Sequence, residues 1–503
     1  MIAQRQTNAP HPEPSAADRY RAALPPGRLE GLRIDPLDRL GIPTYCTTFW
    51  PDRGPSNGGN GYGLTESIAT TGALGELNEV VAAHEAIARM PRRSGSYDQL
   101  VAALGTRAVL DPLTACLDAG SPYTPSMRLE WVEARRYPSG EPVWVPIEFA
   151  ACQGSDVPPG DYLITPITNG LGAGMSQAQA LCHGLLELLQ RDGNGLRFRA
   201  LDAGVAIDLD AVRTPGTVAL LAQLDAAGVE VIVKLACTEF GIANLYVVGL
   251  DRPGHEQGPP IVATACGEAT DPSRERALLK ALLEFAAARA RKAFTHGPLE
   301  AVAEIVPPGY MDRFRAQSLD GEEPRALAEM VRWLSLDHAA MRALLADNAL
   351  RVAERIPFSS LPDAPGAADA QNATDRLPLV AGRLLDAGFE VLYLDFSPAP
   401  ASGVHVVKAI VPGLEVETMS YGRIGERNAR RLLTAGGDLV GLGTPPDSAR
   451  MIPLTEAAYA RLGGRPWLDW AAVMRTVGAL YPLYREPGRH SAPLVAAGLA
   501  GPS

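Results

Sequence analysis

Three segments of the chain share one layout of a hydroxyl residue and a glutamate. The segments are GLTESIATTGALGELNEVV, GMSQAQALCHGLLELLQRDG and DPSRERALLKALLEFAAARARK. In each, a Thr or Ser lies eleven positions before a Glu; the pairs are Thr65 and Glu76, Ser176 and Glu187, and Ser273 and Glu284. A hydroxyl residue suits the N-cap of a helix. We therefore predict three helices, each of which begins at a loop and carries its glutamate about three turns in.

Further polar residues share the helical faces of these glutamates, three or four positions away. They are Glu79, His183, Gln190 and Arg191. Glu187 and Glu284 lie in the apolar runs LLELL and ALLEF, where an ionised carboxylate is costly unless a metal, a cation or hydrogen bonds compensate it. Mg²⁺ prefers a few carboxylates together with phosphate oxygens and water. The pattern therefore indicates a site for Mg²⁺ and a phosphate compound.

A simpler interpretation remains open for each glutamate taken alone. One glutamate in an Ala/Leu helix commonly lies at the edge of the exposed face, and the glycine-rich runs SNGGNGYG and TNGLGAG are compatible with simple turns. The chain contains no GxxxxGK[ST], and no GxGxxG follows a strand in a Rossmann setting. A nucleotide site in this chain would use neither of these common motifs. The observation that favours a nucleotide site is the matched spacing of the three glutamates.

Composition narrows the class of protein. The chain has 503 residues and a formal charge of −11, with 46% hydrophobic and 20% charged residues. An acidic chain without a basic stripe argues against general binding to nucleic acid or to an anionic membrane. No apolar run reaches the roughly 18 residues of a transmembrane helix, and the N-terminus lacks the apolar core of an export signal. Six scattered cysteines without a CxxC pair fit reduced, buried thiols, so we expect a cytoplasmic protein.

The order of elements predicts an α/β or α+β fold. Strand-like runs such as RLEWVEARRY, VEVIVKLA and HVVKAIVPGL are interleaved with long helical patterns. The two glycine-rich runs are expected to be loops. Residues 1–30, rich in Pro, Ala and charge, are predicted to form a disordered arm. Residues 436–503 are expected to form a C-terminal extension.

The run TNGLGAGMSQAQALCHGLLELLQRD resembles the YcaO family, in which a strand ends in an S/T-N-G-x-A-x-G loop and a helix continues to E-x-x-E/Q-R-D. Three more motifs follow the family's order: GYGLTESIATTGALGELNE, ACGEATDPSRERALLKALLEFAAARAR and HVVKAIVPGLEVETMSYGRIGER. The resemblance spans about residues 32–432. It implies a YcaO-like domain over residues 31–435, with mixed sheets and long glutamate-bearing helices around an ATP and Mg²⁺ site.

The resemblance also implies a chemistry. Many YcaO proteins phosphorylate a backbone amide oxygen of a ribosomally made peptide, and the attack of a nucleophile then gives an azoline, a thioamide or an amidine. No catalytic residue is singled out. The residues implied to bind ATP are Gly61, Gly63, Glu76, Glu187, Gln190, Arg191, Glu284 and Arg289. Those implied to hold Mg²⁺ are Glu76, Glu79, Glu187 and Glu284.

The chain departs from the family pattern in three places. Tyr62 replaces the Lys of the usual G-K-G, Val80 replaces the Arg after E-x-x-E, and Ala287 and Ala288 lie where a Gln is common. The sequence also lacks a terminal P-x-P-x-P, which leaves thioamidation and amidine formation open beside azoline formation.

The resemblance implies a precursor peptide as substrate and a separate partner protein, either leader-binding, TfuA-like or E1-like. It implies no nucleic acid and no membrane, and a homodimer is the commonest form if the chain self-associates. The alternative function is that of a non-catalytic scaffold that recruits a maturation complex. A further alternative is an ATP-dependent accessory factor for modifying a larger protein.

Overall fold

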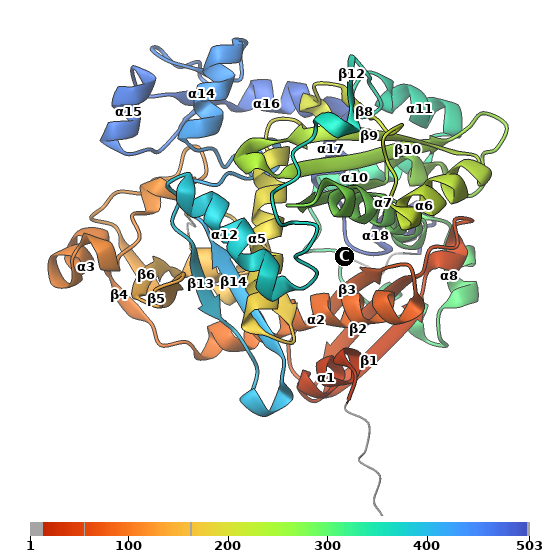
Figure 1. Ribbon diagram of the computed structural model, residues 1–503, viewed down its shortest axis with the longest axis horizontal. Coiled ribbons are helices and arrows are strands. Elements are labelled where there is room, and N and C mark those ends of the chain that lie inside the picture. The colour runs from red at the N-terminus through yellow and green to blue at the C-terminus, as the bar shows by residue number, and fades with distance from the viewer. Residues whose placement is uncertain (1–13, 55, 161–162, 500–503) are drawn as a thin grey trace, which may run out of the picture.

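The computed structural model describes residues 14–54, 56–160 and 163–499, which form helices and four sheets (Figure 1). The expected α+β fold is confirmed. The first sheet is antiparallel, in the order β1-β2-β3. Its strands and the two helices that cover it are β1 (Gly27–Arg33), β2 (Thr44–Pro51), β3 (Asn57–Tyr62), α1 (Ala16–Ala23) and α2 (Glu66–Arg89).

The second sheet has the order β4-β5-β13-β14-β7, and β6 pairs with β5. Its strands come from distant parts of the chain: β4 (Arg93–Ser96), β5 (Arg128–Arg136), β6 (Pro142–Pro146), β7 (Leu171–Gly174), β13 (Leu392–Asp395) and β14 (His405–Ile410). The helices associated with it are α3 (Tyr97–Leu104), α4 (Ile147–Ala150), α5 (Gln177–Asn194) and α12 (Ala373–Asp386).

The third sheet has the order β11-β10-β9-β8-β12, and only β12 and β8 run parallel. Its strands are β8 (Val205–Asp208), β9 (Val229–Cys237), β10 (Ala243–Asp251), β11 (Cys266–Asp271) and β12 (Glu354–Pro357), packed against α6 (Pro215–Ala226) and α7 (Arg274–His296). Figure 1 shows α5 running through the centre of the molecule, where it contacts strands of both the second and the third sheet.

The C-terminal part shares a core with the rest of the chain. Its small sheet is β15 (Val440–Gly441), β17 (Trp467–Asp469) and β16 (Ala449–Met451), with helices α14 (Glu426–Ala435), α15 (Glu456–Leu462) and α16 (Trp470–Val477). Val440, Leu468 and Val473 pack in one apolar cluster with Met330 and Trp333. The remaining helices are α8 (Leu299–Ile305), α9 (Tyr310–Arg315), α10 (Pro324–Leu334), α11 (His338–Ala346), α13 (Thr418–Tyr421), α17 (Tyr481–Tyr484) and α18 (Ser491–Ala496).

Two expectations from the sequence are corrected here. The predicted disordered arm over residues 1–30 is wrong for residues 14–30, because α1 is capped by Ser15 and its Tyr20 is buried against α2; residues 1–13 lie outside the described part. The run SNGGNGYG forms strand β3 rather than a loop, and TNGLGAG is a turn only up to Gly170 and forms strand β7 from Leu171.

Glycine is required in these strands because they lie directly on a helix. A Cβ on Gly61 of β3 would lie 2.0 Å from the Ala69 carbonyl oxygen of α2, and one on Gly172 of β7 would lie 2.0 Å from that of Ala180 in α5. The same contact recurs at Gly267 of β11, 2.1 Å from the Ala281 oxygen of α7. Each predicted glutamate helix therefore packs against its own strand without side chains between the two backbones.

We predict that Gly61→Ala destabilises the protein by more than about 2 kcal/mol, because the added methyl overlaps backbone atoms of α2. Gly382→Ala in α12 is the matched control, since nothing lies within 4 Å of the position and the change removes a helix-weakening glycine. Urea unfolding and scanning calorimetry measure both variants. Equal stability of the two variants would contradict the close-packing argument.

Candidate functional site

The glutamate helices α2, α5 and α7 line a single cavity of about 480 Å³. Thr65 caps α2 by accepting a hydrogen bond from the Ile68 N–H, Ser176 caps α5 in the same way, and Ser273 is the N-cap residue of α7. The lining includes most of the residues singled out from the sequence, namely Gly61, Glu76, Glu79, His183, Glu187, Gln190, Arg191 and Glu284. The volume is typical of a small-molecule site.

Backbone N–H groups of the glycine-rich segments hold three of the carboxylates. The Asn60 N–H of β3 donates to Glu76 Oε2 at 2.8 Å. The Gly170 N–H, just before β7, donates to Glu187 Oε2 at 2.8 Å, and the Ala173 N–H of β7 donates to Glu79 Oε1 at 2.9 Å. β7 thus contacts glutamates from two different helices. These bonds fix one oxygen of each carboxylate; the other oxygen of Glu187 lies 3.6 Å from Arg191.

The carboxylates repel one another. Burial, with Glu187 and Glu76 nearby, raises the pKa of Glu79 to about 8, and burial with Glu268 nearby raises the pKa of Glu284 to about 7. The pKa of Glu76 is also raised, mainly by burial. The Asn60 N–H and Arg291 oppose that rise but do not cancel it. A bound cation stabilises the charged form of such a cluster of carboxylates.

Three cationic side chains reach the same cavity. Arg191 lies 3.6 Å from Glu187 Oε1 and 3.3 Å from Glu268 Oε2, and its Nε is buried without a hydrogen-bond partner. Lys280 and Arg291 of α7 also line the cavity, and among the described residues neither makes a side-chain hydrogen bond or ion pair. Unpaired cations beside a carboxylate cluster are the groups that a polyphosphate and its metal ion need.

The carboxylates of the cavity suit a metal ion only together with other ligands. Across the described ranges, no three His, Cys, Asp or Glu side chains come close enough to hold a metal unaided. Mg²⁺ commonly keeps several waters and takes one or two carboxylates together with substrate phosphates. The separated Glu76, Glu79, Glu187 and Glu284 therefore fit Mg²⁺ arriving with a nucleotide better than a metal bound alone.

Two of the sequence-selected residues lie outside this cavity. Arg289 is fully buried in ion pairs with Asp38, at 2.8 Å, and with Asp251, at 2.9 Å. Arg289 lies five positions after Glu284, about 140° around the helix, whereas Arg291 at seven positions lies within about 20°. Arg291 therefore occupies the place that we expected for Arg289. Gly63 faces Ile68 instead, where a Cβ would lie 2.4 Å from Ile68 Cγ2.

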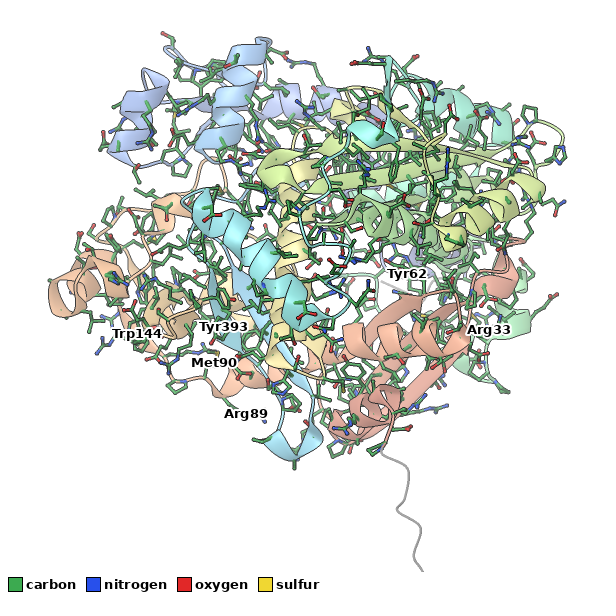
Figure 2. The ribbon with its side chains drawn as sticks, viewed as in Figure 1. Arg33, Tyr62, Arg89, Met90, Trp144 and Tyr393 are labelled. Atoms are coloured by element: carbon green, nitrogen blue, oxygen red, sulfur yellow. The ribbon has the colours of Figure 1, made fainter. Side chains whose placement is uncertain are left out.

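The tyrosine that replaces the usual lysine has a definite contact. Tyr62 lies between the sheet of β3 and the helix α7, and its hydroxyl donates to Glu284 Oε2 at 3.0 Å (Figure 2). The neutral hydroxyl therefore orients a glutamate, where a lysine would add a positive charge. Val80 also lines the cavity, on α2.

Sequence reasoning missed Glu268, Lys280 and Arg291. Glu268 of β11 accepts hydrogen bonds from Asn194 at 2.5 Å and from Gln190 and Arg191 at 3.3 Å, so it orients polar residues of α5. Lys280 lies four positions before Glu284 and Arg291 seven after it. Helical periodicity around Glu284 alone would have identified both cations. Glu268 comes from a strand, and no periodic signal relates it to α5.

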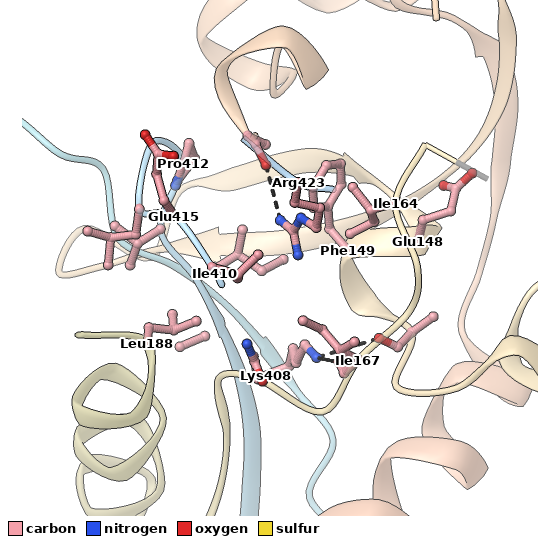
Figure 3. Close-up of a pocket in the computed structure, with 17 residues that line it drawn as sticks. Glu148, Phe149, Ile164, Ile167, Leu188, Lys408, Ile410, Pro412, Glu415 and Arg423 are labelled. Carbon is pink, nitrogen blue, oxygen red and sulfur yellow. Dashed lines mark hydrogen bonds between the residues drawn. The ribbon is translucent and has the colours of Figure 1, made fainter. Parts of the chain in front are cut away.

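A small cavity of about 50 Å³ lies behind the loop that precedes β7 (Figure 3). Lys408 of β14 is buried there without a carboxylate partner, and its ammonium donates to the Ile167 carbonyl at 2.5 Å. This bond fixes the chain three residues before Gly170, whose N–H donates to Glu187. Lys408 therefore positions the loop and is not among the residues that line the cavity of about 480 Å³.

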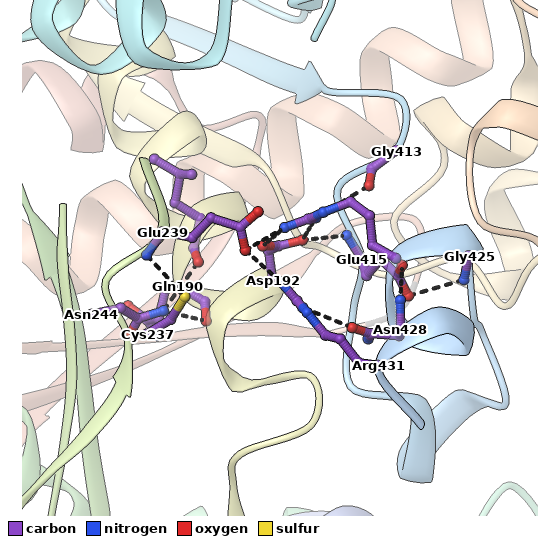
Figure 4. Close-up of polar contacts among 12 residues, drawn as sticks. Gln190, Asp192, Cys237, Glu239, Asn244, Gly413, Glu415, Gly425, Asn428 and Arg431 are labelled. Carbon is purple, nitrogen blue, oxygen red and sulfur yellow. Dashed lines mark hydrogen bonds and ion pairs between the residues drawn. The ribbon is translucent and has the colours of Figure 1, made fainter. Parts of the chain in front are cut away.

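A second polar cluster anchors the end of α5 (Figure 4). Asp192, which ends the E-x-x-Q-R-D run, accepts from Arg427 at 2.5 Å and from the Glu415 N–H at 2.8 Å. Arg427 also pairs with Glu239 at 2.8 Å, so the cluster joins α5, α14 and the turn after β9. Asp192 is thus structural, although it directly follows Arg191 in the chain.

Comparison with known proteins agrees with this geometry. Residues 60–415 match the family described as YcaO cyclodehydratase, ATP- and Mg²⁺-binding, which confirms the resemblance and identifies ATP and Mg²⁺ as the cofactors. An uncharacterised protein of Methanothermobacter thermautotrophicus is 28% identical over 400 residues, which cover 78% of this chain and 91% of that protein.

Two solved structures share the fold. YcaO from Methanopyrus kandleri, bound with AMPPCP and Mg²⁺, has a TM-score of 0.52 and 19% identity over 79% of this chain and 88% of its own. A heterocyclase in complex with substrate and cofactor has a TM-score of 0.55 and 18% identity over 82% of this chain. The chain spans about half of that heterocyclase, 53% of its length. No helix in the described ranges is long and apolar enough to cross a membrane.

We predict that Glu76→Gln or Glu187→Gln weakens Mg²⁺-dependent nucleotide binding at least about tenfold, because each removes a negative charge from the cavity. Glu300→Gln, at an exposed position in the first turn of α8, is the control for the same chemical change. Calorimetric titration with an ATP analogue measures all three. Unchanged binding in both cavity variants would remove these residues from the metal site.

We also predict that Mg²⁺ affinity in the presence of the analogue rises with pH. Glu79 and Glu284, with pKa values of about 8 and 7, hold protons at pH 6 that a metal must displace, and they are largely ionised at pH 8.5. The affinity should therefore be at least about tenfold lower at pH 6 than at pH 8.5. Glu79→Gln should flatten this dependence. A pH-independent affinity in the unmodified protein would contradict the raised pKa values.

Proposed function

The chain belongs to the YcaO family, and from this premise we propose that it is an ATP- and Mg²⁺-dependent enzyme that activates a backbone amide of a ribosomally made peptide. The observation that carries the proposal is the cavity itself. Three helices bring carboxylates into it, the pKa values of Glu79 on α2 and Glu284 on α7 are raised, and the unpaired Lys280 and Arg291 line the same space. A scaffold without nucleotide chemistry has no need of a cluster of carboxylates from three helices, whose mutual repulsion reduces stability.

Each residue has a role in this proposal. Glu76, Glu79, Glu187 and Glu284 would hold Mg²⁺, with Gln190 and Gly61 beside the nucleotide. Bound Mg²⁺ neutralises phosphate charge and polarises the phosphoryl group. Arg191, Lys280 and Arg291 would hold the phosphate oxygens in place, so that positioning and electrostatics supply most of the catalysis. The backbone N–H groups of β3 and β7 hold the carboxylates in fixed positions, where they would lie beside the phosphates.

The proposed reaction balances as a dehydration driven by ATP. The amide oxygen bonds to the γ-phosphorus as the bond from that phosphorus to ADP breaks. A nucleophile then bonds to the amide carbon and loses its proton, and phosphate leaves with the electron pair of the carbon–oxygen bond. For an azoline or an amidine the former amide nitrogen also loses its proton as the carbon–nitrogen double bond forms, whereas a thioamide keeps that proton. A Cys, Ser or Thr side chain gives an azoline, an external sulfide gives a thioamide, and an amine gives an amidine. The site's residues favour none of the three.

The Tyr62 departure is compatible with activity. Its hydroxyl holds Glu284, and two cations on α7 supply positive charge at the cavity that the missing lysine would have supplied. The alternative, a non-catalytic scaffold, rests on Tyr62 and Val80 alone. We also propose that a precursor peptide is the substrate and that a separate leader-binding, TfuA-like or E1-like protein presents it.

Calorimetric titration with AMPPCP, with and without Mg²⁺, is the first test. Saturable, Mg²⁺-dependent binding is expected. The reaction is then tested with ATP and Cys-, Ser- or Thr-containing peptides whose amide oxygen carries a heavy isotope. Transfer of that oxygen to phosphate identifies amide activation, since plain ATP hydrolysis takes its oxygen from water. Absence of AMPPCP binding at millimolar concentration, also with candidate partners present, would favour the scaffold.

A further inference from the structure

A separate cavity of about 240 Å³ lies between the first sheet and the C-terminal segment. Three parts of the chain line it: strands β2 and β3, the residues from the end of α9 to the turn before α10, and the residues that lead into and form α18. Of the described residues that line it, none lines the nucleotide cavity. Most of them also lie outside residues 60–415, so the family match does not account for this cavity.

The lining of this cavity holds one cation and one carboxylate. Among the described residues that line it, Arg489 and Glu322 are the only ionisable ones. No ion pair joins the two, and neither forms an ion pair with any other residue of the described ranges. Opposite charges that face one cavity without contacting each other can each bind the complementary charge of a single ligand. The lining is therefore suited to a zwitterion, a molecule that carries one positive and one negative group.

The guanidinium group of Arg489 is held at one nitrogen. Its Nη1 donates to Thr48 Oγ1 at 2.7 Å and to the Tyr310 hydroxyl at 3.4 Å. Its Nε and Nη2 have no acceptor among the described residues. Nη2 lies against Gly58 of β3, where a Cβ would approach it to 3.0 Å. Nε and Nη2 are the pair of donors on one edge of a guanidinium that binds a carboxylate with two parallel hydrogen bonds.

The carboxylate of Glu322 is also held in place. The Gly488 N–H lies 3.0 Å from each of its oxygens, and the Ser491 hydroxyl donates to Oε1 at 2.6 Å. These neutral donors orient the carboxylate but bring no positive charge to it. An ionised carboxylate has about four acceptor positions, so one position on Oε2 can still accept from an ammonium group.

The backbone at His490 brings two of the polar lining residues together. His490 lies between Arg489 and Ser491 and has a left-handed conformation, with φ 65° and ψ −4°. Residues other than glycine rarely adopt this conformation. The imidazole of His490 is fully buried, and three aromatic rings pack around it. This packing keeps the chain in an unfavourable turn that directs Arg489 and Ser491 to one cavity, and backbone strain of this kind is common at ligand sites.

From this geometry we propose that the cavity binds a free α-amino acid with an uncharged side chain. The carboxylate of the amino acid pairs with Nε and Nη2 of Arg489, and its ammonium group pairs with Glu322. Its side chain packs against the apolar part of the lining, which consists of Phe314, Leu319 and Leu494. A volume of about 240 Å³ is below that of most drug-sized ligand sites and suits a ligand of this size. This site goes beyond the proposed function and does not depend on it.

Calorimetric titration of the full chain tests the proposal. The probes are the standard L-amino acids with uncharged side chains, added without nucleotide. We expect at least one of them to bind saturably at millimolar concentration or below. Two derivatives of the tightest binder then test each charge: the carboxamide lacks the carboxylate, and the N-acetyl form lacks the ammonium group. Each derivative should bind at least about tenfold more weakly than the free amino acid.

Two variants assign these preferences to residues. Glu322→Gln should lose the preference for the free amino acid over its N-acetyl form, and Arg489→Gln should lose the preference over the carboxamide. A general loss of stability would weaken all three ligands alike. Glu300→Gln, exposed on α8, is the matched control and should keep both preferences. If Arg489→Gln does not fold, Glu322→Gln and the two derivatives decide the question.

Three results would overturn the proposal. They are no saturable binding of any of these amino acids at millimolar concentration, equal affinity for the free amino acid and a derivative, and unchanged preferences in Glu322→Gln. Because the titration contains no nucleotide and the two cavities share none of their described lining residues, failure here is distinct from failure of AMPPCP binding.

Discussion

The site depends on one constraint: carboxylates from three helices must lie together in a partly buried cavity although they repel one another. The structure meets this constraint with backbone N–H groups aimed at one oxygen of Glu76, Glu79 and Glu187. Such bonds favour the charged form of a carboxylate. At Glu79 they do not overcome burial, and the pKa is raised to about 8. A bound cation would favour the charged form of these carboxylates, which supports the proposed Mg²⁺ site.

The N–H groups reach the carboxylates only because strand and helix touch. Gly61, Gly172 and Gly267 each allow a strand to lie on the backbone of the next helix, in the first, second and third sheets respectively. A side chain at any of the three would push the strand away from its helix. In the pairs β3–α2 and β7–α5, such a side chain would also lengthen or break the hydrogen bonds to the glutamates. The fold and the site therefore depend on the same steric requirement, a glycine where the strand touches the helix. This requirement recurs in all three strand–helix pairs.

The sequence predicted this site better than it predicted the surrounding elements. Matched spacing after a capping residue located Glu76, Glu187 and Glu284, because helical periodicity carries over from sequence to space. The segments that form β3 and β7 were expected to be loops because glycine usually indicates a turn. Each glycine is needed because a helix packs on the strand, and that helix comes later in the chain, so the local sequence does not reveal the contact. The resemblance implied Arg289, whereas the angle around the helix places Arg291 on the face of Glu284. Tyr20 shows a similar limit: its burial against α2 depends on a tertiary contact that local composition does not encode.

The exchange of a lysine for Tyr62 changes how charge is distributed in the cavity. A lysine at that position would sit on β3, opposite the cations of α7. With Tyr62 the β3 side of the cavity is neutral, its hydroxyl orients Glu284, and the positive charge of Lys280 and Arg291 is concentrated on α7. Both cations line the cavity from α7, on the side opposite β3. The phosphates of a bound nucleotide would therefore be drawn toward α7 rather than toward the first sheet, because a cluster of positive charge attracts polyphosphate oxygens.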